Sequence, residues 1–140
     1  MKLDDKDFKI LKELKKNSRA TVRDIAKVTS IRPSTVHVRI QRMIADGVIE
    51  RFTLKLNNKA IGENFIVFML VKSQDKIDEK LFLNSHVKEV FGVTGEYDLL
   101  LKLKFKDIEE FNDFVITFRE KAPIGVTVTM VSTITLKEEI

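Results

Sequence analysis

The segment from Arg32 to Arg42 carries side chains suited to contact with a polyanion and with the edges of nucleobases. On a helical wheel of about 100° per residue, one face of a helix beginning at Pro33 is small, neutral or cationic and has no carboxylate. Hydroxyl and amide groups can read base edges in a major groove, a valine can contact a thymine methyl group, and cations beside such a face can reach phosphates. The candidate nucleic-acid-binding residues are Arg32, Ser34, Thr35, His37, Val38, Arg39, Gln41 and Arg42.

The run Gly95-Glu96-Tyr97-Asp98 has two interpretations. It is a tight hairpin turn that needs glycine, with Asp98 accepting hydrogen bonds from local backbone N–H groups. Alternatively, its backbone and the Asp98 carboxylate hold the ammonium group of a small molecule. Tyr97, the only tyrosine, either walls such a pocket or fills an interface. Both interpretations stay open at the level of sequence.

Several kinds of chemistry are not expected. The chain has no cysteine and two histidines, His37 and His86, which are too few for a zinc or iron centre. His86 is predicted to lie exposed at a helix end. There is also no glycine-rich phosphate loop. Taken together, these observations lead us to expect no metal, no cofactor and no enzymatic activity. The longest apolar run, Phe65 to Val71, is too short to span a membrane, and no secretory signal begins the chain, which predicts a cytoplasmic protein.

Charge is unevenly distributed. Residues 1–52 carry 13 Lys and Arg against 7 Asp and Glu, a net +6, whereas residues 53–140 carry 12 against 14, a net −2. A basic first part beside a mildly acidic second part suggests a polyanionic partner for the first part only. On charge alone, a lysine-rich solvated surface explains the same imbalance, so the elements that position these residues must decide.

Three helices are predicted in the first fifty residues. Asp4 with Asp7 begins a helix ending near Asn17, and Thr21 with Asp24 begins a second one ending near Thr29. Pro33 fits the first turn of a third helix, and Gly47 can end it in a left-handed conformation. The third helix should bury Val36, Ile40, Met43 and Ile44.

The rest of the chain predicts a short strand, a boundary and a second domain. Residues 48–56 alternate as a strand or wing, and residues 57–63 read as a turn and linker. Strands are expected at 65–71, 87–94, 99–105 and 126–137. Helices are expected after Asp75 with Asp78 and after Asp107 with Glu110, the second burying Ile108, Phe111, Phe114, Val115 and Phe118. This βαββαβ order is the ferredoxin-like pattern, an α+β fold with both helices on one face of an antiparallel sheet.

The other face of that sheet needs a cover. The strand at 65–71 is apolar on both faces. In the strand at 126–137, the residues on the second face are threonines and a valine. Threonine facing water explains the last strand but not the first. We therefore expect a homodimer formed through this face.

Five segments in order carry a family resemblance: Leu3-Asp4 with Asp7 and Ile10-Leu11; Pro33-Ser34-Thr35-Val36 with Arg39-Ile40; Gly47-Val48-Ile49; Thr94-Gly95-Glu96-Tyr97-Asp98; and Pro123-Ile124-Gly125-Val126 with Thr133. Together they resemble the Lrp/AsnC family, the leucine-responsive regulatory proteins of bacteria and archaea, over nearly the whole chain. The resemblance implies a winged helix-turn-helix DNA-binding domain at 1–52, a linker at 53–63, and a dimerisation and effector-binding domain at 64–140. It also implies a sequence-specific transcriptional regulator of duplex DNA, dimers that assemble into higher even-numbered oligomers, and amino-acid effectors held between second domains.

The resemblance also assigns residues. The implied effector site takes Gly95, Glu96, Tyr97 and Asp98, with Ser132 and Thr133 resembling the small polar residues that line such sites, although both are also ordinary strand residues. Where the family usually has a serine before the recognition helix, this chain has Arg32, which cannot cap it. Either Ser30 caps one turn earlier, or Arg32 serves a phosphate instead.

Two other functions compete with this one. A winged-helix protein could bind RNA or a protein partner through the same basic region, and a ferredoxin-like domain could sense a small molecule without any DNA specificity. RNA recognition generally uses exposed aromatic side chains, and the face from Ser34 to Ala45 has none. The sequence therefore favours duplex DNA.

Overall fold

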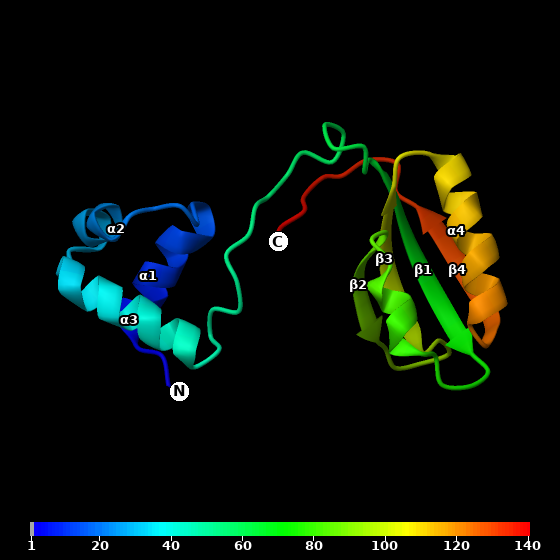
Figure 1. The fold of residues 1–140 in the computed structure, drawn as a ribbon, viewed down its shortest axis with the longest axis horizontal. Helices are drawn as coiled ribbons and strands as arrows, with labels where there is room; N and C mark the ends of the chain where they lie inside the picture. The colour runs from blue at the N-terminus through cyan, green and yellow to red at the C-terminus, as the bar shows by residue number, and fades with distance from the viewer. Residues whose placement is uncertain (1) are drawn as a thin grey trace. The chain divides into compact units, whose positions relative to one another are not determined.

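A computed structural model describes residues 2–140 and divides the chain into two compact units (Figure 1). The first unit contains the residues up to Lys55 together with Ile140, and the second runs from Leu56 to Glu139. Each unit has its own hydrophobic core. The division falls within residues 53–63, for which a linker is predicted.

Three helices form the first unit, α1 (Asp5–Lys16), α2 (Val22–Thr29) and α3 (Pro33–Ala45), as predicted. Two capping boxes begin α1 and α2, Asp4 with Asp7 and Thr21 with Asp24; in each, both side chains accept a hydrogen bond from the other residue's backbone N–H. Gly47 follows α3 with a φ of 73°, the left-handed conformation predicted for it.

The core of the first unit draws on all three helices. Its buried residues are Ile10, Leu14, Ile25, Ala26, Ile31, Val36, Ile40 and Met43. Three of the four residues predicted to face inward from α3 are therefore buried, whereas Ile44 in the last turn is 40% exposed. The core fixes which side of α3 is left for other contacts.

The segment after α3 contains no strand, so the strand predicted within 48–56 is absent. The backbone N–H groups of Val48 and Ile49 donate to the Met43 carbonyl at 2.8 and 3.1 Å, which keeps them at the end of the helix. The chain then passes to a turn near residues 58–62 without a returning strand in this unit, and strand structure needs a ladder partner. One contact to this segment is the hydrogen bond from Ser18 Oγ to the Thr53 carbonyl, at 3.1 Å.

The second unit is a four-stranded antiparallel sheet in the order β2-β3-β1-β4. Its elements are β1 (Phe65–Ser73), the 3-10 helix η1 (Glu79–Leu83), β2 (Val87–Gly92), β3 (Leu99–Phe105), α4 (Ile108–Lys121) and β4 (Ile124–Val131). Residues of η1 and α4 pack against the same buried cluster, to which β1 and β3 contribute. The ferredoxin-like order and layering are confirmed.

Two elements of this unit are shorter than predicted. The helix expected after Asp75 is only a 3-10 turn, because the Asp75 carboxylate accepts from the adjacent Lys76 N–H and Asp78 accepts from Lys80 N–H, closing local turns. The last strand ends at Val131 instead of continuing to residue 137. The backbone N–H of residue 132 donates to the carbonyl of residue 66 at 2.8 Å. Because β1 begins at Phe65, the register leaves only that residue beyond this bond, and a strand reaching residue 137 would have no partner in β1.

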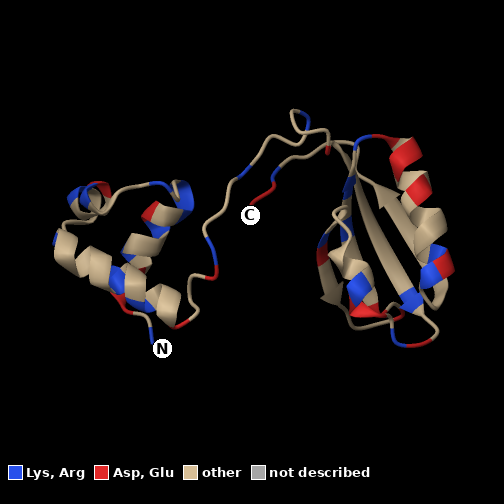
Figure 2. Cartoon of the chain, viewed as in Figure 1, with Lys and Arg blue, Asp and Glu red and all other residues tan. Residues whose placement is uncertain are grey.

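The buried side of α4 is predicted correctly except for its first residue. Phe114 and Phe118 are buried and Phe111 and Val115 pack against them, whereas Ile108 is 51% exposed. Ile108 is the first residue of the helix, three residues after β3 ends at Phe105. Figure 2 shows acidic residues in the first turns of α4, the arrangement that the helix dipole favours, and basic residues beside an acidic one near its end.

The sheet has one face without a helix, which we call the open face. The register places Phe68 opposite Met130, and Leu70 opposite both Val128 and Leu100. Met130 is 47% exposed although it is apolar. The open face consists of Phe68, Leu70, Phe91, Leu100, Val126, Val128 and Met130, with Lys102 and Lys104 at one end. Among residues 2–140, no helix is long and apolar enough to cross a bilayer.

Candidate nucleic-acid interface

The outer face of α3 is accessible within its own unit. Ser34, Val38, Gln41 and Arg42 are exposed, and Thr35 is partly exposed. Val38 is 63% exposed near the middle of the helix, where an apolar side chain gains nothing from water. Along α3, Figure 2 shows basic residues and no acidic one. The predicted orientation of the helix is therefore confirmed within the first unit.

The start of α3 has no side-chain cap. Arg32 occupies the N-cap position without a side-chain hydrogen bond, and Pro33 begins the helix. Ser30 lies at the end of α2 with a φ of 58°, a left-handed conformation, so the alternative in which Ser30 caps α3 is wrong. Arg32 and His37 are both exposed.

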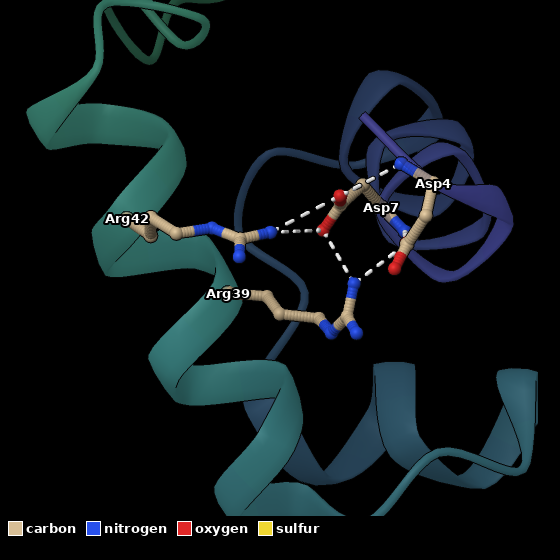
Figure 3. Close-up of polar contacts among 4 residues, drawn as sticks. All are labelled: Asp4, Asp7, Arg39 and Arg42. Atoms are coloured by element: carbon tan, nitrogen blue, oxygen red, sulfur yellow. Dashed lines mark hydrogen bonds and ion pairs between the residues drawn. The ribbon is translucent and has the colours of Figure 1, made fainter. Parts of the chain in front are cut away.

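Two arginines of α3 form ion pairs with two aspartates at the start of α1 (Figure 3). Arg39 Nη1 donates to Asp4 Oδ1 at 2.6 Å and to Asp7 Oδ1 at 2.9 Å. Arg42 Nη2 lies 3.3 Å from Asp7 Oδ1 and 3.2 Å from Asp7 Oδ2. These contacts tie α3 to the N-terminus of α1.

The four side chains of this cluster differ in exposure. The Asp7 side chain is fully buried and that of Arg39 is 18% exposed, whereas those of Arg42 and Asp4 are 47% and 55% exposed. A buried carboxylate is tolerated only when paired, and Asp7 has two guanidinium partners. The Arg39 guanidinium, followed by the Asp7 backbone N–H, lowers the pKa of the Asp4 carboxyl to about 2. Arg39 is thus engaged inside the unit with little exposure, whereas Arg42 pairs with Asp7 but stays about half exposed.

In the second unit, the run from Gly95 to Asp98 forms the turn between β2 and β3. Gly95 has a φ of 108°, which favours glycine. The Asp98 carboxylate accepts from the backbone N–H and the hydroxyl of Ser73, at 2.9 and 3.3 Å, and the Asp98 backbone N–H donates to the Val71 carbonyl at 2.9 Å. The Gly95 conformation fits the hairpin-turn interpretation, but the Asp98 carboxylate bonds to Ser73 at the end of β1 and not to N–H groups of the turn itself. Tyr97 is partly buried there.

Ser132 and Thr133 lie at the opposite end of β1 from this turn. Ser132 bonds to Ile66, whereas Asp98 bonds to Ser73, seven residues further along the same strand. That separation corresponds to about 20 Å of strand. The candidate effector residues are therefore not brought together in one chain.

His86 is not exposed as predicted. Its ring stacks on Phe105 with centroids 4.7 Å apart, and Nδ1 lies 2.9 Å from the Lys104 carbonyl and 3.3 Å from Glu110 Oε1. The ring thus belongs to the edge of the core. The part of the chain that the structure describes contains no group of three or more His, Asp or Glu side chains placed to hold a metal ion.

Sequence reasoning missed two charged clusters. Asp7 was predicted only as a residue of the helix start, although the pairs Asp4/Asp7 and Arg39/Arg42 share a spacing of three residues and could have been matched. The second cluster joins Glu138 to Lys102 and Lys104 of β3, at 2.5 and 3.0 Å, and to the Asn58 amide at 3.0 Å. Burial raises the pKa of Glu138, but these hydrogen bonds outweigh it and hold the pKa well below its usual range. No periodicity marks residue 138 for this contact.

Comparison with known families assigns both units. Residues 3–50 match the family described as winged helix-turn-helix DNA-binding, and residues 66–140 match the Lrp/AsnC ligand binding domain. An HTH-type transcriptional regulator of Pyrococcus horikoshii, itself uncharacterised, is 40% identical over 146 residues, covering 99% of this chain and 97% of that protein. The HTH-type transcriptional regulator FL11 of Pyrococcus furiosus is 38% identical over 117 residues, covering 81% and 78%.

Solved structures share the fold. An AsnC family transcriptional regulator from Agrobacterium tumefaciens superposes with a TM-score of 0.88 at 24% identity, covering 98% of this chain and 94% of that one. A transcriptional regulator from Neisseria meningitidis in complex with L-methionine has a TM-score of 0.90 at 23% identity, covering 99% and 94%. The chain is a helix-turn-helix transcriptional regulator with a ligand-binding domain. It belongs to the Lrp/AsnC family, whose members are regulators and not enzymes.

Proposed function

We propose that the chain regulates transcription as a homodimer that reads duplex DNA through the outer face of α3. The observation that carries this proposal is the exposed, carboxylate-free face of a helix in a unit whose sequence is strongly basic. Ser34, Thr35, Val38 and Gln41 would contact base edges. Arg32, His37 and Arg42 would contact phosphates, and Arg39 would orient α3 through its ion pairs.

The division of labour follows the predicted boundaries. Residues 1–52 bind DNA, residues 53–63 link, and residues 64–140 dimerise and bind an effector. The apolar open face supports dimerisation, because a second copy would cover on both chains what no helix covers in one. A dimer sets two recognition helices about 34 Å, or a multiple of it, apart on a pseudo-palindromic site. We also propose that these dimers assemble into higher even-numbered oligomers and that the protein acts in the cytoplasm.

An amino acid is the proposed effector. The solved structures of the Neisseria meningitidis regulator and of a feast or famine regulatory protein from M. tuberculosis are both complexes with L-methionine, which supports this ligand class. The site would use Gly95, Glu96, Tyr97 and Asp98. Because Ser132 and Thr133 lie at the other end of β1, they would join it only from a second copy.

Selection of bound sites from random duplexes, followed by binding measurements on variants, tests the DNA proposal. Thr35→Ala and Gln41→Ala should change the preferred bases, whereas Arg32→Ala, which removes an exposed cation, should weaken binding to all sequences alike. Repeating the selection with a panel of amino acids tests the effector. If all three variants bind every duplex as the parent chain does, α3 is not the reading element.

A further inference from the structure

Arg39 and Arg42 make different use of the buried carboxylate of Asp7. Arg39 is nearly buried and bonds two carboxylates through one nitrogen, Nη1. Arg42 is 47% exposed and reaches Asp7 through Nη2 alone, and the described residues give its Nε and Nη1 no partner. Arg39 therefore fastens α3 to α1, while Arg42 keeps donors for another anion.

Asp7 is itself held rigidly. Its backbone N–H donates to the Asp4 carboxylate and its own carboxylate accepts from the Asp4 N–H, each at 3.0 Å. Its side chain is fully buried, and it is bonded by Arg39 as well as by Arg42. The carboxylate is thus a fixed anchor beneath the C-terminal half of α3 (Figure 3).

A guanidinium that is already held by a carboxylate differs from an unpaired one mainly in the side-chain conformational entropy that it loses on binding. A long exposed side chain loses rotamer freedom when it binds, and a side chain that is already ordered avoids this cost. Two aspartates and two arginines make the cluster neutral, so it adds little attraction for phosphates. Its contribution is the direction in which the donors of Arg42 point.

We propose that Asp7 is a positioning residue for DNA recognition, which holds Arg42 so that its remaining donors meet one particular phosphate or base edge of the preferred site. The inference rests on the proposed function. It implies that Asp7 supports specific binding and not general attraction to DNA. A residue with a merely structural role would affect both alike.

The test compares Asp7→Asn with Asp24→Asn in the full-length chain. Asp24 has the same position in the capping box of α2, is exposed and has no arginine partner among residues 2–140, so it matches the change in charge. Affinities are measured for the selected duplex and for a scrambled one. Asp7→Asn should lower the affinity for the selected duplex about tenfold. Its affinity for the scrambled duplex should stay equal or rise, because a negative charge is lost.

Asp24→Asn should leave the ratio of the two affinities unchanged. The proposal would be overturned if Asp7→Asn changed the affinities for both duplexes by the same factor and so left their ratio unchanged. If the parent chain does not distinguish the duplexes at all, the proposed function fails, and that result is separate from failure of this inference.

A second variant covers the case in which Asp7→Asn does not fold, as judged by circular dichroism. Arg42→Lys keeps the positive charge and leaves Asp7 paired with Arg39, so the fold should persist. One ammonium lacks the planar fork needed to hold Asp7 and a phosphate in a fixed geometry. We expect specific affinity to fall several-fold with an unchanged salt dependence. Parent-like specific affinity in Arg42→Lys would overturn the proposal.

Discussion

Replacing Met130 by glutamate on the open face should convert the proposed dimer into a monomer. Met130 is 47% exposed, so covering the rest of its side chain would contribute about 1 kcal/mol from each copy. A glutamate there must also leave water, at an effective cost of several kcal/mol per charge. In a two-fold interface each change counts twice, so dimerisation should weaken by at least about 4 kcal/mol, roughly a thousandfold.

Sedimentation velocity over a range of concentrations measures this change. Val131→Glu is the matched control, because Val131 is also 47% exposed on the same strand but lies on the other face, opposite Val67. The parent chain and the control should sediment as dimers or larger assemblies where Met130→Glu sediments as a monomer. A Met130→Glu chain that stays associated, or a control that dissociates equally, refutes dimerisation through the open face.

Three further predictions concern stability. Arg39 is the main cause that lowers the pKa of Asp4 from 3.8 to about 2. The ion pair therefore stabilises the fold above pH 3.8, and this contribution is lost as the pH falls through about 2. The thermal unfolding midpoint of Asp4→Asn should accordingly change less with pH over this range than that of the parent chain. Gly47→Ala should destabilise the first unit by about 1 kcal/mol because of its φ of 73°, whereas Gly92→Ala, with ordinary backbone and open space, should cost little in chemical denaturation. Gly125→Ala should destabilise the second unit, because the new Cβ would lie 3.0 Å from a carbonyl oxygen of β1, and a parent-like unfolding midpoint would contradict this.

Local signals predicted most of the fold. The capping boxes at Asp4 and Thr21, the proline at the start of α3 and Gly47 at its end act within a few residues, so their positions followed directly from the sequence. The four strands were found because their apolar residues alternate or run together. Errors occurred where a strand depends on a partner, as at 48–56 and after Val131, since alternation does not say whether a second strand is present.

In the candidate site, too, features set by nearby residues were predicted, and features that depend on distant residues were not. The exposed face of α3 follows from helical periodicity, which also places Val38 outside. Arg39 and Arg42 are both arginines of the same helix, yet they differ in exposure. Arg39 pairs with Asp4 and Asp7 and is 18% exposed, whereas Arg42 pairs with Asp7 alone and is 47% exposed. Such pairs depend on how helices pack, which a single sequence does not state. Likewise, only the strand register reveals that Ser132 and Asp98 lie at opposite ends of β1.

The measurement that tests the central claim most directly is the affinity of Val38→Glu for the selected duplex, beside Val28→Glu. Val38 on α3 and Val28 on α2 are 63% and 66% exposed, so the same substitution should leave both chains folded. If the outer face of α3 lies against DNA, Val38→Glu should bind at least about a hundredfold more weakly, because a carboxylate would replace an apolar contact beside phosphates. Val28→Glu should lose far less. Equal affinities for the two variants would contradict the assignment of α3 as the reading helix.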